Sequence, residues 1–182
     1  MQWTLKSFRS SSAGHLEAAE RILEPQSKKG RQAPGLTPGS AAYLAHVALE
    51  CAMKARLLWR AGCADTEKLQ TQLPKVHRTH FAGKQGHNLR KHAAELGLAK
   101  LVKEEGHEWS DDDCWHRMCG GERPYSLRYA GEEVNAEQAR EELDRATKLR
   151  EILVSGISSR LKKLGEQAKC PIDKKSKRKG SK

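Results

Sequence analysis

The segment from residue 40 to residue 60, SAAYLAHVALECAMKARLLWR, constrains the fold more than any other because it is apolar on nearly every side of a helix. At about 100° per residue, one face carries a continuous apolar stripe: Leu44, Ala48, Cys51, Ala55 and Leu58. The opposite face is largely apolar too. A helix of this kind is either central in its bundle or shared with a partner chain, so the segment predicts a buried helix that organises the fold.

The opposite face of this helix also carries a row of polar side chains. His46, Glu50 and Lys54 follow one another at intervals of four residues. Glu50 and Lys54 have the spacing and order of a helical ion pair, which stabilises an exposed helix by only about 0.2–0.5 kcal/mol. We therefore expect an ordinary surface ion pair here. The apolar residues of the same face are then candidates for a dimer interface: Leu49, Met53 and Leu57.

The composition favours helices for the rest of the chain. Of the 182 residues, 37% are hydrophobic but only 5% are aromatic, so a core must be built largely from Leu, Ala, Val and Ile. Closely spaced helices suit these side chains better than a sheet does. Since the length fits one domain with tails, the sequence predicts a single all-α domain.

The sequence carries no sign of secretion or membrane insertion. It has no N-terminal apolar run with a cleavage site, and no segment approaches the roughly 20 apolar residues of a membrane span. Five cysteines show no dense disulfide framework, which is typical of free thiols in a reducing compartment: Cys51, Cys63, Cys114, Cys119 and Cys170. We therefore expect a cytoplasmic protein that makes no membrane contact.

Gly- and Pro-rich stretches divide the chain into four parts. Residues 1–25 form an N-terminal helix that ends near Leu23, and residues 26–39, with three Gly and two Pro, form a flexible linker. Residues 40–165 form the helical bundle, which holds an insert at 107–124. Residues 166–182 form a disordered basic tail, because they offer almost no apolar side chain to bury.

The net charge of +11 is concentrated at the two ends of the chain. Residues 162–182 carry +7, residues 1–39 carry +3, and the remaining residues are left with +1. The tail is therefore either a solubilising segment or a sequence-independent contact to the phosphates of RNA or DNA. The second alternative makes the chain a tail-driven RNA- or DNA-binding protein.

Two further helices begin at asparagine caps. Asn88 can cap a helix whose apolar positions share one face, and Gly97 is a suitable stop. The stretch NAEQ (135–138) resembles a capping box with Asn in the usual Ser or Thr position. It starts a long helix with one apolar stripe: Ala139, Leu143, Ala146, Leu153, Ile157, Leu161 and Leu164. The opposite face is predicted to be mixed-charge and solvated: Glu137, Glu141, Glu142, Arg145, Lys148 and Glu151.

The order of these segments resembles the motifs of the HEPN family, the nucleotide-binding helical domains of higher eukaryotes and prokaryotes. The similar stretches are ECAMKARLL (50–58), GHNLRKHAAELGL (86–98), LRYAG (127–131) and NAEQAREELDRATKLREIL (135–153). Together they cover about residues 40–160. The resemblance implies an antiparallel bundle of four or five helices that is usually dimeric.

Individual residues carry the resemblance. Glu50 and Lys54 fall on the family's E-x-x-x-K pair, with Tyr43 near its aromatic position. His87 and Leu89 fall on its H-D-L signature, although Asn88 replaces the acidic residue. Arg128 and Tyr129 fall on its R-Y signature, although Ala130 follows them in place of the usual proline.

The ribonuclease branch of the family uses an R-x(4–6)-H motif near its last helices to cleave RNA without a metal. Such cleavage needs a base for the ribose 2′-OH and a cation for the charge that develops on the phosphate. No histidine follows His116, so this motif is missing from its usual position. The spacing occurs at Arg9 and His15, a match that chance also produces. A ribonuclease toxin is therefore the alternative to a non-catalytic protein.

The resemblance then implies the non-catalytic branch, which is similar to the helical domain of kanamycin nucleotidyltransferase and to partners of minimal nucleotidyltransferases. Such proteins belong to toxin–antitoxin and phage-defence modules. A homodimer, or a heteromer with a nucleotidyltransferase-like protein, is expected, with a nucleotide or RNA as ligand and no cofactor. The basic groups for a phosphate are Lys54, His87, Arg90 and Arg128; alternatively, they pair within the chain with Glu50, Glu95 and Glu133.

The insert at 107–124 contains four residues of the types that bind zinc: His107, Cys114, His116 and Cys119. Their spacing matches no common zinc motif. The alternative is a short helix capped by Ser110, in which Trp115 packs on the end of the bundle together with Trp109. This second interpretation makes the insert the expected place for partner specificity.

Overall fold

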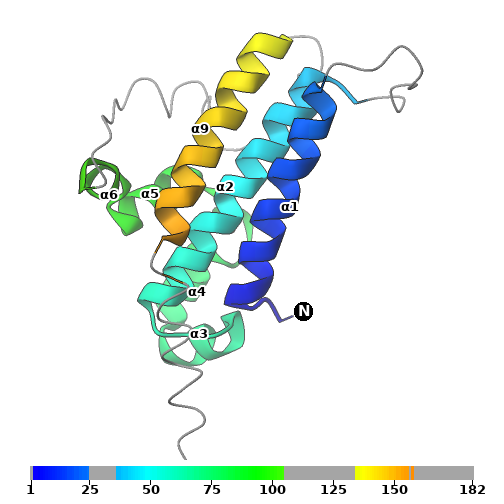
Figure 1. The fold of residues 1–182 in the computed structure, drawn as a ribbon. Coiled ribbons are helices and arrows are strands. Elements are labelled where there is room, and N and C mark those ends of the chain that lie inside the picture. The colour runs from blue at the N-terminus through cyan, green and yellow to red at the C-terminus, as the bar shows by residue number, and fades with distance from the viewer. Residues whose placement is uncertain (1, 25–35, 105–133, 156, 158–182) are drawn as a thin grey trace, which may run out of the picture.

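The computed structural model describes residues 2–24, 36–104, 134–155 and 157, and three long helices dominate it (Figure 1). They are α1 (Leu5–Leu23), α2 (Pro38–Arg60) and α9 (Ala136–Val154). Between α2 and α9 lie α3 (Thr66–Gln72), α4 (Pro74–His80), the 3-10 helix η1 (Lys84–His87), α5 (Leu89–Leu96) and α6 (Leu98–Glu104). Within the described residues every regular element is a helix, as the all-α prediction requires.

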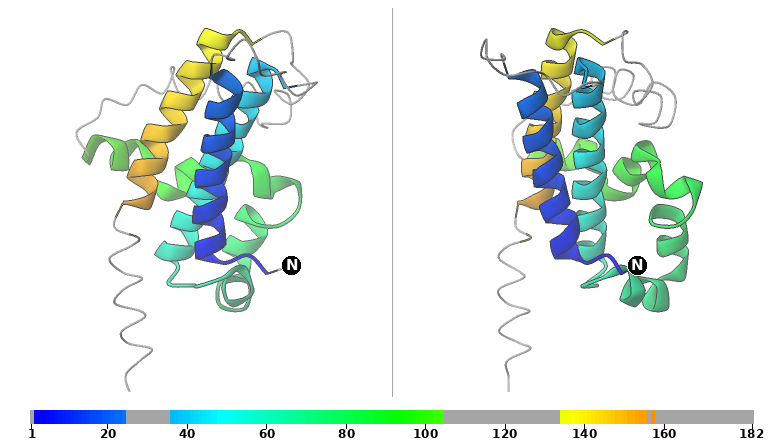
Figure 2. Two further views of the ribbon diagram at one scale, coloured as in Figure 1. Left: turned by 45° about the vertical axis from the view of Figure 1, so that its right-hand side comes forward. Right: turned by 90° about the vertical axis from the view of Figure 1, so that its right-hand side faces the viewer.

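Helix α2 is central in the molecule. It packs against α1 on one side and α9 on another, and α5 covers part of its length (Figure 2). Residues on nearly all its sides are buried, whereas Leu44 and Cys51 of the predicted stripe are only partly buried. Leu49, Met53 and Leu57 are at most 4% exposed. The suggested dimer interface through these three residues is therefore wrong, because they already pack within one chain.

The directions of the three long helices differ from an antiparallel arrangement. Helices α1 and α2 are antiparallel, but α2 and α9 run in the same direction (Figure 1). Near the ends of α2 and α9, the Arg56 guanidinium donates to the carbonyl of Ser155 at 2.9 Å. Near the start of α9, Arg140 donates to the carbonyl of Leu23 at the end of α1, at 3.2 Å. The long connection between α2 and α9 permits the parallel pair, since it returns the chain to the same end.

Local capping sets the helix ends. Asn88 accepts a hydrogen bond from the amide of Lys91, and Gly97 ends α5 in the left-handed conformation with φ of 61°, as predicted. The capping box of Asn135 and Gln138 is also confirmed. Helix α2 begins slightly earlier than expected, because Thr37 forms a capping box with Ser40 and Pro38 occupies the first helical position, where proline is well tolerated.

The segment from residue 61 to residue 97, here called the arm, stands to one side of the three long helices (Figure 2). A small apolar cluster under the arm joins it to the start of α1 and the end of α2: Leu5, Phe8, Ala55, Leu58, Cys63, Leu69 and Ile157. The larger core lies among α1, α2, α5, α6 and α9. The arm is thus attached through both clusters, by Cys63 and Leu69 in the small one and by α5 in the larger one, and it meets the side of α2 that carries Glu50 and Lys54.

Several predicted features lie outside the described residues, including the insert, the basic tail, and most of the linker. Arg128, Tyr129 and the four suggested zinc ligands lie there as well: His107, Cys114, His116 and Cys119. Among the described helices, none is both long and apolar enough to cross a membrane.

Candidate functional site

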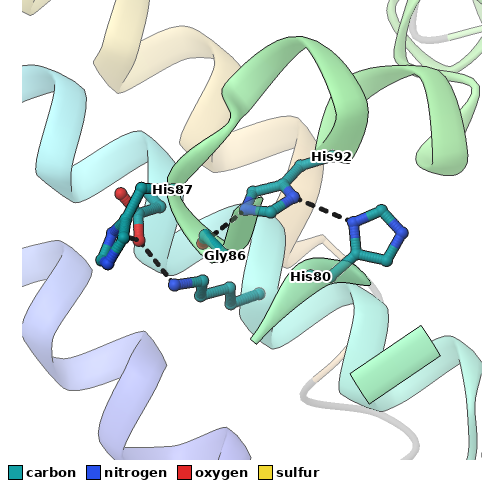
Figure 3. A network of polar contacts seen from close by, with 6 residues as sticks. His80, Gly86, His87 and His92 are labelled. Atoms are coloured by element: carbon teal, nitrogen blue, oxygen red, sulfur yellow. Dashed lines mark hydrogen bonds and ion pairs between the residues drawn. The ribbon is translucent and has the colours of Figure 1, made fainter. Parts of the chain in front are cut away.

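A polar cluster lies where the arm meets α2, and Figure 3 shows its arm residues His80, Gly86, His87 and His92. The Lys54 ammonium donates to Glu50 Oε1 at 2.6 Å, and Nδ1 of His87 lies 3.0 Å from the same oxygen. Glu50 and Lys54 are each only 7% exposed. The predicted ion pair therefore forms, but the expectation of a surface pair is wrong, because η1 and α5 cover this side of α2.

The Glu50 carboxylate is ionised in spite of its burial. Burial raises the pKa of Glu50, but the hydrogen bond from His87 and the charge of Lys54 outweigh it and hold the pKa below its usual value of 4.5. Removing one charge of a buried pair leaves the other uncompensated, which costs about 3–5 kcal/mol. The cluster therefore fixes the junction between α2 and the arm.

Two further histidines continue the polar cluster into the arm. Nε2 of His92 lies 3.1 Å from the carbonyl oxygen of Gly86, and Nδ1 of His92 lies 3.0 Å from Nδ1 of His80. A carbonyl oxygen only accepts, so the His92 proton is on Nε2. In neutral His92, Nδ1 must then accept, and His80 donates to it. In this pair the protons are therefore on Nε2 of His92 and on Nδ1 of His80.

Burial keeps both of these histidines neutral. It lowers the pKa of His92 to about 4, with the charge of Lys54 acting in the same direction. Burial also lowers the pKa of His80, although the carboxylate of Glu95 opposes this effect. At neutral pH the two imidazoles are therefore neutral and the Glu50–Lys54 pair is ionised. In this cluster each hydrogen-bond donor named above faces an acceptor.

The local sequence explains how these side chains converge. Glu50 and Lys54 lie one turn apart on α2, whereas His87 ends η1 immediately before the Asn88 cap. At Gly86 a Cβ atom would lie 3.1 Å from the backbone carbon of Phe81, so glycine allows the close turn between α4 and α5. The turn brings the Gly86 carbonyl to His92.

The remaining predicted site residues are spread over the fold. Arg90 is exposed on α5, Leu89 is buried beneath it, and Tyr43 is partly buried on α2. Arg9 and His15 both lie on α1. Six residues of helix separate them by about 9 Å along the axis and about 120° around it, so one chain does not direct both side chains at one phosphate.

The sequence patterns did not reveal three buried polar residues. His80 and His92 lie in segments where no functional pattern was found, and Glu142 was predicted to face solvent. The Glu142 carboxylate instead lies 3.5 Å from Nε2 of the fully buried His46. The row of His46, Glu50 and Lys54 could have predicted buried polar partners. A helix as buried as α2 also buries the side chains that pair with its polar residues.

The thiols and carboxylates of the described residues offer little further chemistry. Cys51 and Cys63 are free, as expected, and burial raises the pKa of Cys51 to about 11. Its thiol is therefore protonated and unreactive near pH 7. Within the described residues, no group of three or more His, Cys, Asp and Glu side chains is arranged to hold a metal ion.

Comparisons with known proteins do not identify a family: no family model matches the sequence, and searches of curated proteins and of solved structures give no match.

Proposed function

We propose that the chain is a HEPN-like, non-catalytic binding module that recognises a phosphate-bearing ligand such as a nucleotide. The observation that carries this proposal is the contact between Glu50–Lys54 and His87. These residues belong to two of the stretches that resemble HEPN motifs, and more than 30 residues of sequence separate them. A contact between two separate motif stretches supports a common fold signature, beyond a coincidence of short patterns.

The state of the charged groups favours binding over catalysis. The charge of Lys54 is compensated by Glu50, so a buried cation is not available to stabilise a transition state on its own. Arg9 and His15 do not converge within one chain. A ribonuclease formed by this pair would require groups from two chains, which makes RNA cleavage the alternative function.

The exposed edge of the cluster is the proposed ligand contact. The His87 side chain is 42% exposed while its Nδ1 is held by Glu50, and Arg90 is exposed at the start of α5. A phosphate could accept hydrogen bonds from the Arg90 guanidinium and, where His87 is an imidazolium, from its Nε2, while Nδ1 of His87 still donates to Glu50 and Lys54 stays paired. We further propose that the module works as a homodimer or beside a nucleotidyltransferase-like protein, in a toxin–antitoxin or phage-defence setting.

Calorimetry with the full chain tests the ligand. We expect ATP and pyrophosphate to bind the wild type and the control Lys148→Ala, an exposed change on α9, with similar affinity. The variants His87→Ala and Arg90→Ala should each bind at least five-fold more weakly. Equal binding by all four proteins would contradict the proposed site.

The light-scattering mass of the purified chain, with and without a nucleotidyltransferase-like protein, tests the assembly. A dimer or a stoichiometric complex is expected. A monomer that associates with neither would contradict this part of the proposal. Cleavage of generic RNA that disappears in His15→Ala would instead establish the ribonuclease alternative.

A further inference from the structure

The end of the molecule that carries the N-terminus brings together aromatic and basic side chains from α1 and the arm. The ring of Trp3 stacks on Phe8 with centroids 5.6 Å apart, and Phe8 contacts Phe81 at 5.9 Å. The Phe81 ring stacks in turn on His77 of α4 at 6.2 Å. This aromatic row begins at Trp3, which is 42% exposed, passes through the buried Phe8 and ends at the partly buried Phe81 and His77.

The backbone holds Trp3 in a fixed position beside α3. The carbonyl of Trp3 accepts from the amide of Thr66 at 2.9 Å, and the amide of Leu5 donates to the carbonyl of Ala64 at 2.9 Å. The N-terminal segment therefore does not move independently of the arm. Stacking on Phe8 also holds the Trp3 ring in place, and the exposed part of the ring is accessible to a partner outside the described fold.

The segments that meet at this end of the molecule are rich in basic residues and poor in carboxylates. Residues 2–16 contain two Lys or Arg, residues 68–94 contain six, and neither stretch contains an Asp or Glu. Four of these basic side chains are exposed at this end of the molecule: Lys6 on α1, Lys68 on α3, and Lys75 and Arg78 on α4. Lys75 and Arg78 are three residues apart and so share one face of α4.

The arm has three carboxylates, which do not balance its six Lys and Arg residues: Asp65, Glu67 and Glu95. Asp65 is engaged in the N-cap of α3, where it accepts from the amide of Lys68 at 2.8 Å. Glu67 is exposed on the first turn of the same helix. The near-neutral body that the overall charge suggested is therefore uneven, since its positive charge gathers on the arm.

We propose that this end of the molecule binds single-stranded nucleic acid, with a base stacked on Trp3 and phosphates contacting Lys6, Lys68, Lys75 and Arg78. Single strands are commonly bound through exposed aromatic rings and a basic path for the backbone. The binding is independent of sequence because stacking and phosphate contacts do not distinguish bases. This surface is separate from the nucleotide contact proposed at His87 and does not depend on it.

The test is fluorescence anisotropy of the full chain with a labelled 12-nucleotide poly-U RNA, and with poly-dT of the same length. The charge-reversal variant Lys75→Glu/Arg78→Glu should bind at least ten-fold more weakly than the wild type. Its salt dependence should also fall, by about 0.7 in slope for each lost phosphate contact. Both positions are exposed, and circular dichroism will show whether the fold is kept.

A matched control separates this surface from general charge and from the basic tail. The variant Lys103→Glu/Lys148→Glu makes the same charge change on α6 and α9 and leaves the tail intact. It should bind within about three-fold of the wild type. Equal losses in the two double variants would overturn the proposal, because the tail or the net charge would then account for the affinity.

Two substitutions of Trp3 test the stacking. Trp3→Leu should weaken binding about five-fold or more, the lower end of the loss expected when one stacking ring is removed. Trp3→Phe keeps an aromatic ring and should retain most of the affinity. Equal affinities for the two variants would overturn the stacking contact. Binding of anionic phosphatidylserine vesicles in preference to both single strands would instead identify a lipid-binding surface and overturn the proposal.

Discussion

The two polar contacts of α2 differ sharply, although they lie about one turn apart. His46 is fully buried, its Nε2 is 3.5 Å from the Glu142 carboxylate, and neither ring nitrogen makes a hydrogen bond with the described residues. Glu50, in contrast, accepts from both Lys54 and His87. The difference reflects what lies opposite: His46 faces the middle of α9, where backbone groups are already paired, while Glu50 faces the end of a short helix.

The comparison shows that burial alone does not make a polar residue useful to the fold. A pair with complete hydrogen bonds holds two elements together, and breaking it is costly. A buried pair without complete hydrogen bonds costs the free energy of desolvation and adds little stability in compensation. The first kind is a candidate site or a structural anchor, whereas the second is a place where apolar residues would serve the fold equally well.

The largest effect is expected from breaking the complete cluster. Lys54→Met leaves Glu50 buried with His87 as its remaining partner, and we expect a loss of about 3 kcal/mol in the free energy of unfolding. Urea denaturation followed by circular dichroism measures it. The double variant Glu50→Gln/Lys54→Met removes both charges and should lose clearly less. If it lost as much as the single variant, uncompensated charge would not be the cause.

The next effect is the dependence of stability on pH. Burial lowers the pKa of His92 from 6.5 to about 4. Between pH 6.5 and pH 4, His92 is therefore protonated in the unfolded chain but neutral in the folded chain. Stability therefore falls as pH falls from 7 to 5, by about 2 kcal/mol from this residue. Glu50 acts at lower pH, because the stability from its lowered pKa is lost as pH falls from about the usual value of 4.5 through the lower pKa of the folded chain. Denaturation of His92→Gln should show a smaller difference between pH 7 and pH 5, and an unchanged difference would exclude His92 as its source.

Replacing the incomplete pair tests the other side of the comparison. We expect His46→Leu/Glu142→Leu to keep the stability of the wild type or to raise it by about 1 kcal/mol, since it removes two buried polar groups. Thermal and urea unfolding measure the change. A loss of more than about 2 kcal/mol would mean that the pair stabilises the fold as the Glu50 cluster does.

The smallest expected effect comes from two helix caps, Asn88 next to the candidate site and Asn135 in a capping box far from it in sequence. Asn88→Ala and Asn135→Ala each remove a side-chain cap and should each cost about 1 kcal/mol. Asn88 is next to His87, so its loss should also weaken ATP binding, whereas Asn135→Ala should leave it unchanged. Calorimetry separates the two, and equal ATP affinities would show that the cap does not position His87.

The sequence was most informative where a feature is local. The Asn88 and Asn135 caps, the stop at Gly97 and the buried character of α2 all depend on neighbouring residues, so their patterns predict them. The direction of α9 was not predictable in this way, because it depends on how the long segment before it returns the chain.

Within the candidate site, the sequence pointed to Glu50, Lys54 and His87 but not to their surroundings or to the two buried histidines. The Glu50–Lys54 spacing predicted an ion pair, yet its burial depends on the distant η1 and α5. His80 and His92 could not be predicted as partners, because the turn at Gly86 decides which nitrogens meet. Glu142 was assigned to solvent since its neighbours on α9 are charged, whereas its helical position places it on the buried side with Ala139, Leu143 and Ala146.

The parallel course of α2 and α9 has a consequence for the order in which the molecule folds. The hairpin of α1 and α2 closes over residues 24–37, but α9 reaches α2 only after the 75 residues that separate the two helices. Contacts that are distant in sequence form late, because the entropy of closing the loop must be lost first. We therefore expect α1, α2 and the arm to assemble while the chain is being synthesised, and α9 to dock last. Core substitutions in α9 should then speed unfolding and leave the folding rate almost unchanged.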